Sequence, residues 1–224
     1  FKGDGASQSA GRGVKAGTAW RMPDGSRYTA AVTESCFAMA VDPQILQFHQ
    51  RVAERFGALP APEDAPARRA RFEAIAALTE RPDPEGVEIS DLSLPLPGRT
   101  LDAIVFRPAH VAKPGMLVWF HGGGWVLCSL DTHDNVCRNL CASVGAVVVS
   151  IDYRMAPEHR FPVASDDCLA AVRWVADHAG SLGIDPAKLI VGGDSAGGNL
   201  AAVTALRIRD EGGPALSGQM LIYP

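Results

Sequence analysis

The sequence predicts an α/β fold in which a mostly parallel sheet is covered by helices on both faces. Four short runs are apolar at nearly every position, at 116–120, 146–151, 188–191 and 219–223. Segments of helical character lie between them, at about 132–144, 165–180 and 196–210. Strands that are apolar on both sides and alternate with helices are typical of a parallel sheet buried on both faces.

The composition excludes several classes of protein. The chain has 224 residues, 47% of them hydrophobic, and a formal net charge of −4. Nucleic acid is excluded as the main partner because phosphate binding needs a basic face. No transmembrane segment is expected, since every apolar run is too short to cross a bilayer. The five cysteines form no C-x-x-C pair and favour free thiols, and no export signal is visible, so a cytoplasmic location is the expectation.

The N-terminal part differs in character from the rest. Residues 1–38 carry six glycines, scattered charges and no apolar period, which predicts a leader or disordered tail, with Met39 as a candidate natural start. Residues 39–82 predict two accessory helices. The first begins with Asp42 as cap and Pro43, and ends at Gly57. The second is rich in Arg and Ala and runs from about 66 to 79.

The remaining residues, 83–224, are expected to form the core of the fold. The segments 87–96 and 100–106 predict an antiparallel hairpin, because Pro97 and Gly98 form a turn between them. The four apolar runs then supply the parallel strands. Because no helix follows the run at 219–223, we expect a sheet truncated after about the sixth strand, with the last strands missing.

The strongest chemical motif is the G-x-S-x-G segment at 193–197, which lies between an apolar strand and a helix. A tight turn in that context exposes the Ser195 hydroxyl, while Gly193 and Gly197 let strand and helix approach closely. The helix N-terminus also places backbone N–H groups beside the hydroxyl, where an oxyanion can form. The alternative is a glycine-rich turn with a capping serine.

A second glycine-rich segment, HGGGW at 121–125, directly follows the strand at 116–120. Its glycines allow backbone N–H groups to converge on one point. Both segments follow strands of a parallel sheet, so they are expected to meet at its carboxyl edge. The alternative for the second segment alone is a flexible turn.

Four ordered segments resemble the bacterial hormone-sensitive-lipase-like esterases, also called GDXG lipolytic enzymes, of the α/β-hydrolase fold. The segments are HGGGW at 121–125, LDTH at 130–133, DYRMAPEHRFP at 152–162 and GDSAGGNL at 193–200. The resemblance covers about residues 40–224. It implies a carboxylic ester hydrolase that acts on small-molecule esters of short- to medium-chain acids without a metal or organic cofactor. It also implies that the N-terminal helices belong to a cap over the pocket.

The resemblance assigns roles to individual residues. Ser195 is the nucleophile, and the backbone N–H groups of Gly122, Gly123 and Ala196 form the oxyanion hole. His121 and Gly124 support the loop at 121–125 that carries these glycines, the oxyanion loop.

Other residues near these motifs receive structural roles. Asp194 lies between Gly193 and Ser195 in the turn at 193–197, the elbow. It is expected to be a hydrogen-bonding partner, because its side chain points away from Ser195. Trp125 and Tyr153 are expected either to line the pocket or to be packed aromatics. Arg154 and Glu158 are expected to form an ion pair.

The sequence departs from the family pattern after the nucleophile. A serine hydrolase of this fold needs an acid and then a histidine after the serine. Here only Asp210 and Glu211 follow Ser195, with no histidine. The family carries both groups after further strands, so the 224-residue chain itself is expected to lack turnover. His159, in a loop at the carboxyl edge, is the least implausible substitute.

Several alternatives stay open from the sequence. An acyltransferase or amidase would use the same Ser195. A ligand-binding relative, like the plant gibberellin receptor that resembles this family, would keep the pocket without the triad, and an inactive fragment would have neither. His133, Cys137 and Cys141 recur every four residues as metal ligands can, but a core-facing helical stripe is the preferred interpretation. The oligomeric state is not indicated.

Overall fold

The computed structural model describes residues 20–21, 27–28, 41–57, 62, 64–79, 82–110 and 115–224. The chain divides into two units, Phe1–Pro43 and Gln44–Pro224. The prediction for residues 1–38 lies outside the described residues, apart from β1 (Trp20–Arg21) and β2 (Arg27–Tyr28), which pair antiparallel.

The second unit contains a six-stranded sheet in the order β3-β4-β6-β5-β7-β8. Its strands are β3 (Val87–Leu96), β4 (Arg99–Pro108), β5 (Met116–Phe120), β6 (Val147–Ile151), β7 (Leu189–Asp194) and β8 (Gly218–Ile222). Strands β3 and β4 form the predicted hairpin, and β4 pairs antiparallel with β6. The pairs β6–β5, β5–β7 and β7–β8 are parallel. The predicted mostly parallel sheet is therefore confirmed.

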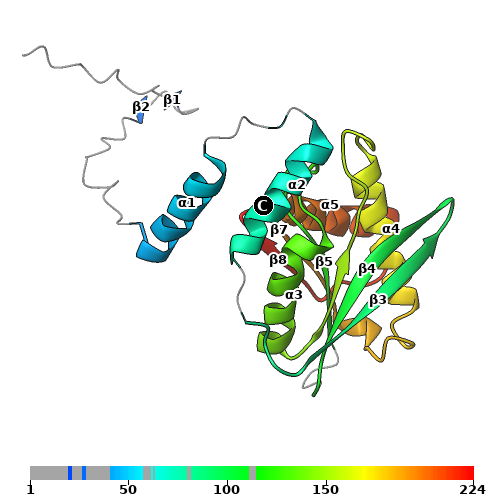
Figure 1. The fold of residues 1–224 in the computed structure, drawn as a ribbon. Coiled ribbons are helices and arrows are strands. Elements are labelled where there is room, and N and C mark those ends of the chain that lie inside the picture. The colour runs from blue at the N-terminus through cyan, green and yellow to red at the C-terminus, as the bar shows by residue number, and fades with distance from the viewer. Residues whose placement is uncertain are drawn as a thin grey trace, which may run out of the picture. The chain divides into compact units, whose positions relative to one another are not determined.

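Helices cover both faces of this sheet (Figure 1). They are α3 (Leu130–Val144), α4 (Val163–Asp177) and α5 (Ala196–Glu211). Helix α3 packs on β4 and β6, whereas α4 and α5 pack against each other on the opposite face. The doubly covered sheet explains why the four parallel strands are apolar on both sides.

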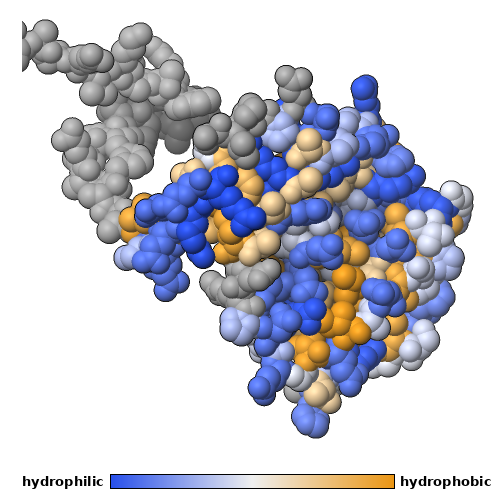
Figure 2. Space-filling model, in the orientation of Figure 1, coloured by the Kyte–Doolittle hydropathy of each residue, from blue (hydrophilic) through white to orange (hydrophobic). Residues whose placement is uncertain are grey.

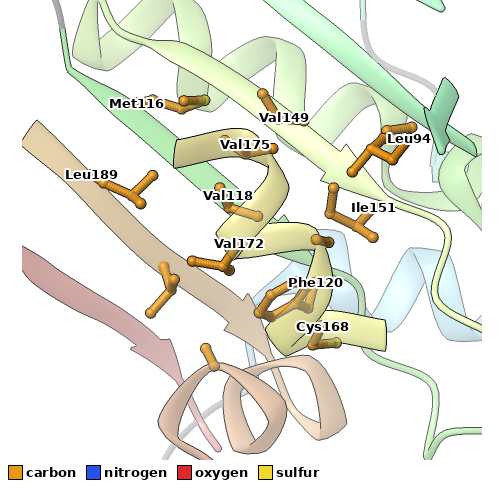
Figure 3. Packing of buried hydrophobic residues seen from close by; sticks show 14 of the residues in the cluster. Leu94, Met116, Val118, Phe120, Val149, Ile151, Cys168, Val172, Val175 and Leu189 are labelled. Carbon is orange, nitrogen blue, oxygen red and sulfur yellow. The ribbon is translucent and has the colours of Figure 1, made fainter. Parts of the chain in front are cut away.

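The two faces of β5 show how the core is built. Met116, Val118 and Phe120 point into the larger cluster, where they meet residues of α4 such as Val172 and Cys168 (Figure 3). Leu117 and Trp119 point to the other face, toward α3. This alternation follows from the period of two residues along a strand.

The cysteine stripe of α3 faces the core. Cys137 and Cys141 are buried in the cluster under α3, and His133 lies one turn before them. The preferred interpretation of a core-facing stripe is therefore confirmed. Among the described side chains, no group of three or more His, Cys, Asp or Glu is arranged to hold a metal ion.

The predicted N-terminal helices are α1 (Pro43–Phe56) and α2 (Ala65–Ala76), the latter followed by the 3-10 turn η2 (Ala77–Thr79). The carboxylate of Asp64 caps α2 by accepting a hydrogen bond from the N–H of Ala67 at 2.7 Å. Helix α2 packs on α3. No helix within the described ranges is long and apolar enough to cross a membrane.

The surface of the described part is mixed. In Figure 2 hydrophilic residues cover most of the face shown, and hydrophobic residues gather in smaller patches. Val136 and Val144 on α3 are among the large hydrophobic residues that remain exposed.

Candidate active site

The turn from β7 to α5 holds Ser195 in an unusual backbone conformation. Ser195 has φ +51° and ψ −121°, a region that residues with a Cβ rarely adopt. Its side chain is exposed. Its own N–H donates to the carbonyl of Ile222 at 2.9 Å, so β8 holds the turn in place. The predicted sharp turn therefore presents the Ser195 hydroxyl above the carboxyl edge of the sheet.

The glycines of the elbow are required by close backbone contacts. A Cβ atom at Gly197 would overlap the carbonyl oxygen of Phe120, and one at Gly193 would overlap the same oxygen and the backbone of Gly197. The end of β5, the end of β7 and the start of α5 therefore meet without intervening side chains.

The oxyanion loop, residues 121–125, starts where β5 ends. Gly123 and Gly124 have φ +109° and +63°, and the Gly123 carbonyl accepts hydrogen bonds from the N–H groups of Val126 and Leu127. This tight turn sends the chain away from the sheet. A Cβ at Gly123 would overlap the backbone of Leu127, which explains the glycine at that position.

Gly122 differs from the expectation. Its N–H donates to Asp194 Oδ1 at 3.1 Å, so it is already occupied and cannot serve as an oxyanion donor. In the part of the chain that the structure describes, no hydrogen bond occupies the N–H groups of Gly123, Gly124 or Ala196. The expectation for Gly122 is therefore wrong, because a carboxylate distant in the sequence takes its only donor.

Asp194 sits under the oxyanion loop and accepts hydrogen bonds from two sides. His133 Nε2 lies 3.1 Å from Asp194 Oδ1, the same oxygen that accepts from Gly122. Burial raises the pKa of Asp194, but the hydrogen bond and charge of His133 and the Gly122 N–H lower it more, so that the net shift is downward. Asp194 therefore stays ionised and links α3 to the loop.

His121 and Tyr153 form the buried base of the loop. His121 Nδ1 donates to the Gly122 carbonyl at 2.7 Å, and its ring stacks on Tyr153 with centroids 4.4 Å apart. The Tyr153 hydroxyl donates to the His121 carbonyl at 2.8 Å. Burial lowers the pKa of His121 to about 4.

This packing corrects one of the two interpretations of Tyr153. Tyr153 is a packed aromatic and does not line the pocket, because its ring is buried against His121.

A cavity of about 390 Å³ opens next to the oxyanion loop. The oxyanion loop and the N-terminal ends of α4 and α5 contribute to its walls, which are mostly apolar. The lining includes Gly124, Trp125, His159, Phe161, Leu200 and Val203. Trp125 thus lines the cavity, as one of its two interpretations expects, with 43% of its surface exposed.

Known proteins share this arrangement. Residues 117–224 match the family model described as alpha/beta hydrolase fold. The chain is 42% identical over 191 residues to the carboxylic ester hydrolase LipN of Mycobacterium tuberculosis, covering 82% of this chain and 50% of that protein. It is 42% identical over 168 residues to an ethyl acetate hydrolase of Pseudomonas putida, covering 72% of this chain and 52% of that protein.

This chain is also similar to an esterase of known structure. The hyperthermophilic esterase of the archaeon Pyrobaculum calidifontis superimposes with a TM-score of 0.76 at 42% identity, covering 83% of this chain and 59% of that one. The chain belongs to the hormone-sensitive-lipase-like esterase family of α/β hydrolases. It spans about half the length of the curated relatives that it matches.

The histidine base that a serine hydrolase needs is not found at the Ser195 hydroxyl among the described residues. All six histidines of the chain precede Ser195 in the sequence. Within the described residues, the hydrogen bonds of the histidine rings go to other groups, and none reaches the Ser195 hydroxyl. His159 is the histidine among the residues that line the cavity.

The expected Arg154–Glu158 ion pair is wrong. Arg154 donates instead to the buried Asp167 through Nε at 2.8 Å and Nη2 at 2.9 Å. Glu158 pairs with Arg69 of α2 at 2.7 Å. Arg154 and Asp167 are 13 residues apart and Arg69 and Glu158 are 89 apart, so proximity along the chain does not reveal either pair.

The sequence did not reveal the contacts of three residues that hold this region together, namely His133, Arg69 and Asp167. His133 lies in one of the segments that carry the resemblance, where the sequence suggests only a metal ligand or a core residue. Arg69 is one of several arginines in an Arg/Ala-rich helix, and that pattern does not indicate a specific contact.

Proposed function

We propose that the protein carrying this chain hydrolyses carboxylic esters of short- to medium-chain acids with Ser195 as nucleophile. The observation that carries the proposal is the exposed Ser195 in a positive-φ turn at the N-terminus of α5. Relatives named carboxylic ester hydrolase and ethyl acetate hydrolase support the reaction class. Neither a metal nor an organic cofactor enters the proposed reaction.

The proposed reaction proceeds through an acyl-enzyme. The Ser195 Oγ attacks the ester carbonyl, its proton passes to a base, and the tetrahedral intermediate expels the alcohol. Water then attacks the acyl-serine ester and releases the acid. The two steps replace one difficult hydrolysis with two easier ones.

The oxyanion donors in this proposal are the N–H groups of Gly123, Gly124 and Ala196. They replace the set that includes Gly122, whose N–H is bonded to Asp194. The first N–H groups of a helix have no partner within it, and its dipole favours negative charge there, which supports the inclusion of Ala196. A single such donor typically contributes about 100-fold or more to the rate.

The substrate class rests on the cavity. Its volume of about 390 Å³ and its apolar walls suit a short or medium acyl chain better than a charged or bulky group. We also propose that residues 39–82 act as a cap, since Arg69 of α2 donates to the carbonyls of Val126 and Ala156 beside this cavity.

The base of the proposed reaction is assigned outside these 224 residues. Within the described residues, the rings of His121, His133 and His178 bond to other groups, and no histidine ring is hydrogen-bonded to the Ser195 hydroxyl. A base within hydrogen-bond reach of the hydroxyl is required for attack. His159 is the candidate that competes with this assignment.

Hydrolysis of p-nitrophenyl butyrate tests the proposal. In the protein carrying this chain, Ser195→Ala is expected to lower kcat about 10⁴-fold or more, because the nucleophile is lost. Ser181→Ala, which changes an exposed serine, serves as the control and should keep full activity. Substrate binding without Ser195-dependent turnover would favour the ligand-binding alternative. Ser195-dependent turnover by residues 1–224 alone, abolished by His159→Ala, would contradict the assignment of the base.

A further inference from the structure

We propose that His133 is a positioning residue: as an imidazolium it holds the Asp194 carboxylate, and through it the Gly122 N–H, so that the oxyanion loop is fixed over Ser195. The inference rests on the proposed function for its catalytic meaning. Its structural content, the protonation of His133, can be tested without any turnover.

The first turn of α3 fixes the position of the His133 ring. Ser129 and Thr132 form a reciprocal capping box at the start of the helix. The Thr132 hydroxyl accepts from the N–H of Ser129 at 2.9 Å and donates to the Ser129 carbonyl at 2.9 Å. We assign the single hydroxyl proton of Thr132 to the bond with the Ser129 carbonyl, so that Thr132 has none left to donate to the His133 ring.

The hydrogen bonds then determine the protons on His133. The Thr132 oxygen lies 3.0 Å from His133 Nδ1 and can only accept, so Nδ1 carries a proton. On the other side of the ring, Nε2 faces Asp194 Oδ1 at 3.1 Å, and an ionised carboxylate also only accepts. Both ring nitrogens therefore donate, which is the pattern of an imidazolium.

The competing assignment places the second proton on Asp194. Asp194 Oδ1 also accepts from the Gly122 N–H at 3.1 Å, a bond that favours the ionised carboxylate. The pKa of Asp194 is shifted downward despite its burial, as described above. The His133 and Asp194 side chains are only 11% and 17% exposed, so water screens the pair weakly.

Within the described residues, Asp194 is the carboxylate that lies within ion-pair distance of the His133 ring. The other titratable groups around this pair are His121 after β5, Cys128 and Cys137 before and within α3, and the carboxylates of Glu73 and Asp134, which act on Cys128 and Cys137 respectively. Burial lowers the pKa of His121 to about 4 and raises the thiol pKa values of Cys128 and Cys137. These three groups are uncharged at neutral pH, and Asp194 is the charged group that contacts the His133 ring.

The consequence for catalysis follows from the shared oxygen. Asp194 can hold Gly122 in place only while its own carboxylate is held, and His133 is the side chain that does so. Without His133 the carboxylate can rotate and the loop that carries Gly123 and Gly124 loses its anchor. A misplacement of about 1 Å in the donors can cost about 100-fold in rate.

The first experiment measures the imidazole nitrogens of the 224-residue chain by ¹H–¹⁵N NMR at pH 7, with His133→Gln used to assign the signal. We expect two protonated nitrogens on His133. A neutral His133 ring at pH 7 with one unprotonated nitrogen would overturn the inference. This readout does not depend on whether the protein hydrolyses esters.

The second experiment compares His133→Leu with His133→Gln in the protein carrying this chain, by p-nitrophenyl butyrate kinetics. We expect Leu to lower kcat about 100-fold with little change in KM, because the loop supplies donors to the transition state. Glutamine can still donate to Asp194 and should recover most of the loss.

Cys137→Ala is the matched control, since Cys137 is buried on the same face of α3 one turn later. It should leave kcat unchanged. Equal losses in the Leu, Gln and Ala variants would mean that α3 merely packs there, and would overturn the inference. Absence of Ser195-dependent turnover would instead reject the proposed function and leave the NMR result to decide the state of His133.

Discussion

Ser195 is available for chemistry because of one backbone conformation. A residue with a Cβ at positive φ costs about 1–2 kcal/mol, and such strain persists only where the surroundings fix it. The N–H bond to Ile222 and the backbone contacts at Gly197 do so here. Beneath the oxyanion loop, His121 is likewise set by its surroundings, which bury it as a neutral ring.

Burial of His121 predicts how stability depends on pH. Its pKa is about 4 in the folded protein against a usual 6.5, so between these values the unfolded chain binds a proton that the folded chain does not. The free energy of unfolding should therefore fall as the pH decreases from about 6.5 to 4, by about 3 kcal/mol. Urea unfolding at pH 7, 5.5 and 4 measures this change.

The matched comparison for this prediction uses two histidine variants. His121→Asn, which can still donate to the Gly122 carbonyl, should flatten the dependence on pH between 6.5 and 4. His178→Gln, at an exposed histidine, should keep it. An unchanged slope in the His121 variant would show that other groups cause the loss of stability.

At the scale of elements, Arg69 ties helix α2 to two loops beside the cavity. Its Nε donates to the Val126 carbonyl at 2.7 Å and its Nη2 to the Ala156 carbonyl at 2.9 Å. Both terminal nitrogens also bind Glu158, at 3.0 and 2.7 Å, which lowers the pKa of that carboxyl to about 2. The planar fork of arginine can make all these bonds at once, whereas a lysine cannot.

Arg69→Lys is therefore expected to weaken this connection although it preserves the charge. We expect kcat/KM for p-nitrophenyl butyrate to fall about 10-fold, because the end of the oxyanion loop loses a support. Arg68→Lys is the control on the same helix, since Arg68 donates only to the Pro62 carbonyl among the bonds described. Equal effects of the two substitutions would argue against a specific role of Arg69.

At the scale of the whole molecule, the fully buried Asp167 joins three distant segments. It accepts hydrogen bonds from the backbone and side chain of Arg154 in the loop after β6, and it pairs with Arg99 at the start of β4 at 2.5 Å. Asp167 itself lies on α4. The hairpin, the loop and the helix are thus held by a single carboxylate.

Asp167→Asn should destabilise the fold by about 3 kcal/mol, because two arginines lose their charged partner in a largely buried place. Urea unfolding followed by tryptophan fluorescence measures the change. Asp166→Asn, at the neighbouring half-exposed carboxylate, should cost less than about 1 kcal/mol. A similar small loss at both positions would show that the buried carboxylate does not hold these segments together.

Much of the fold could be predicted from local patterns. The four apolar runs correspond to β5, β6, β7 and β8 with ends shifted by a few residues at most, because a strand buried on both faces must be apolar at successive positions. The helices between them and the turn at Gly98 follow from equally local preferences. The glycine-rich segments were recognisable because only glycine allows such close backbone approach.

The sequence by itself determined the order of strands and helices and the positions of the elbow and the oxyanion loop, since these depend on neighbouring residues. Only the tertiary structure decided which groups pair. Gly122 and Asp194 are 72 residues apart, and Arg69 and Glu158 are 89 apart. A hydrogen bond forms between groups that folding brings within about 3 Å, and separation along the chain does not encode that distance. For this reason the occupied N–H of Gly122, the buried Tyr153 and the contact of His133 with Asp194 emerged only from the folded protein.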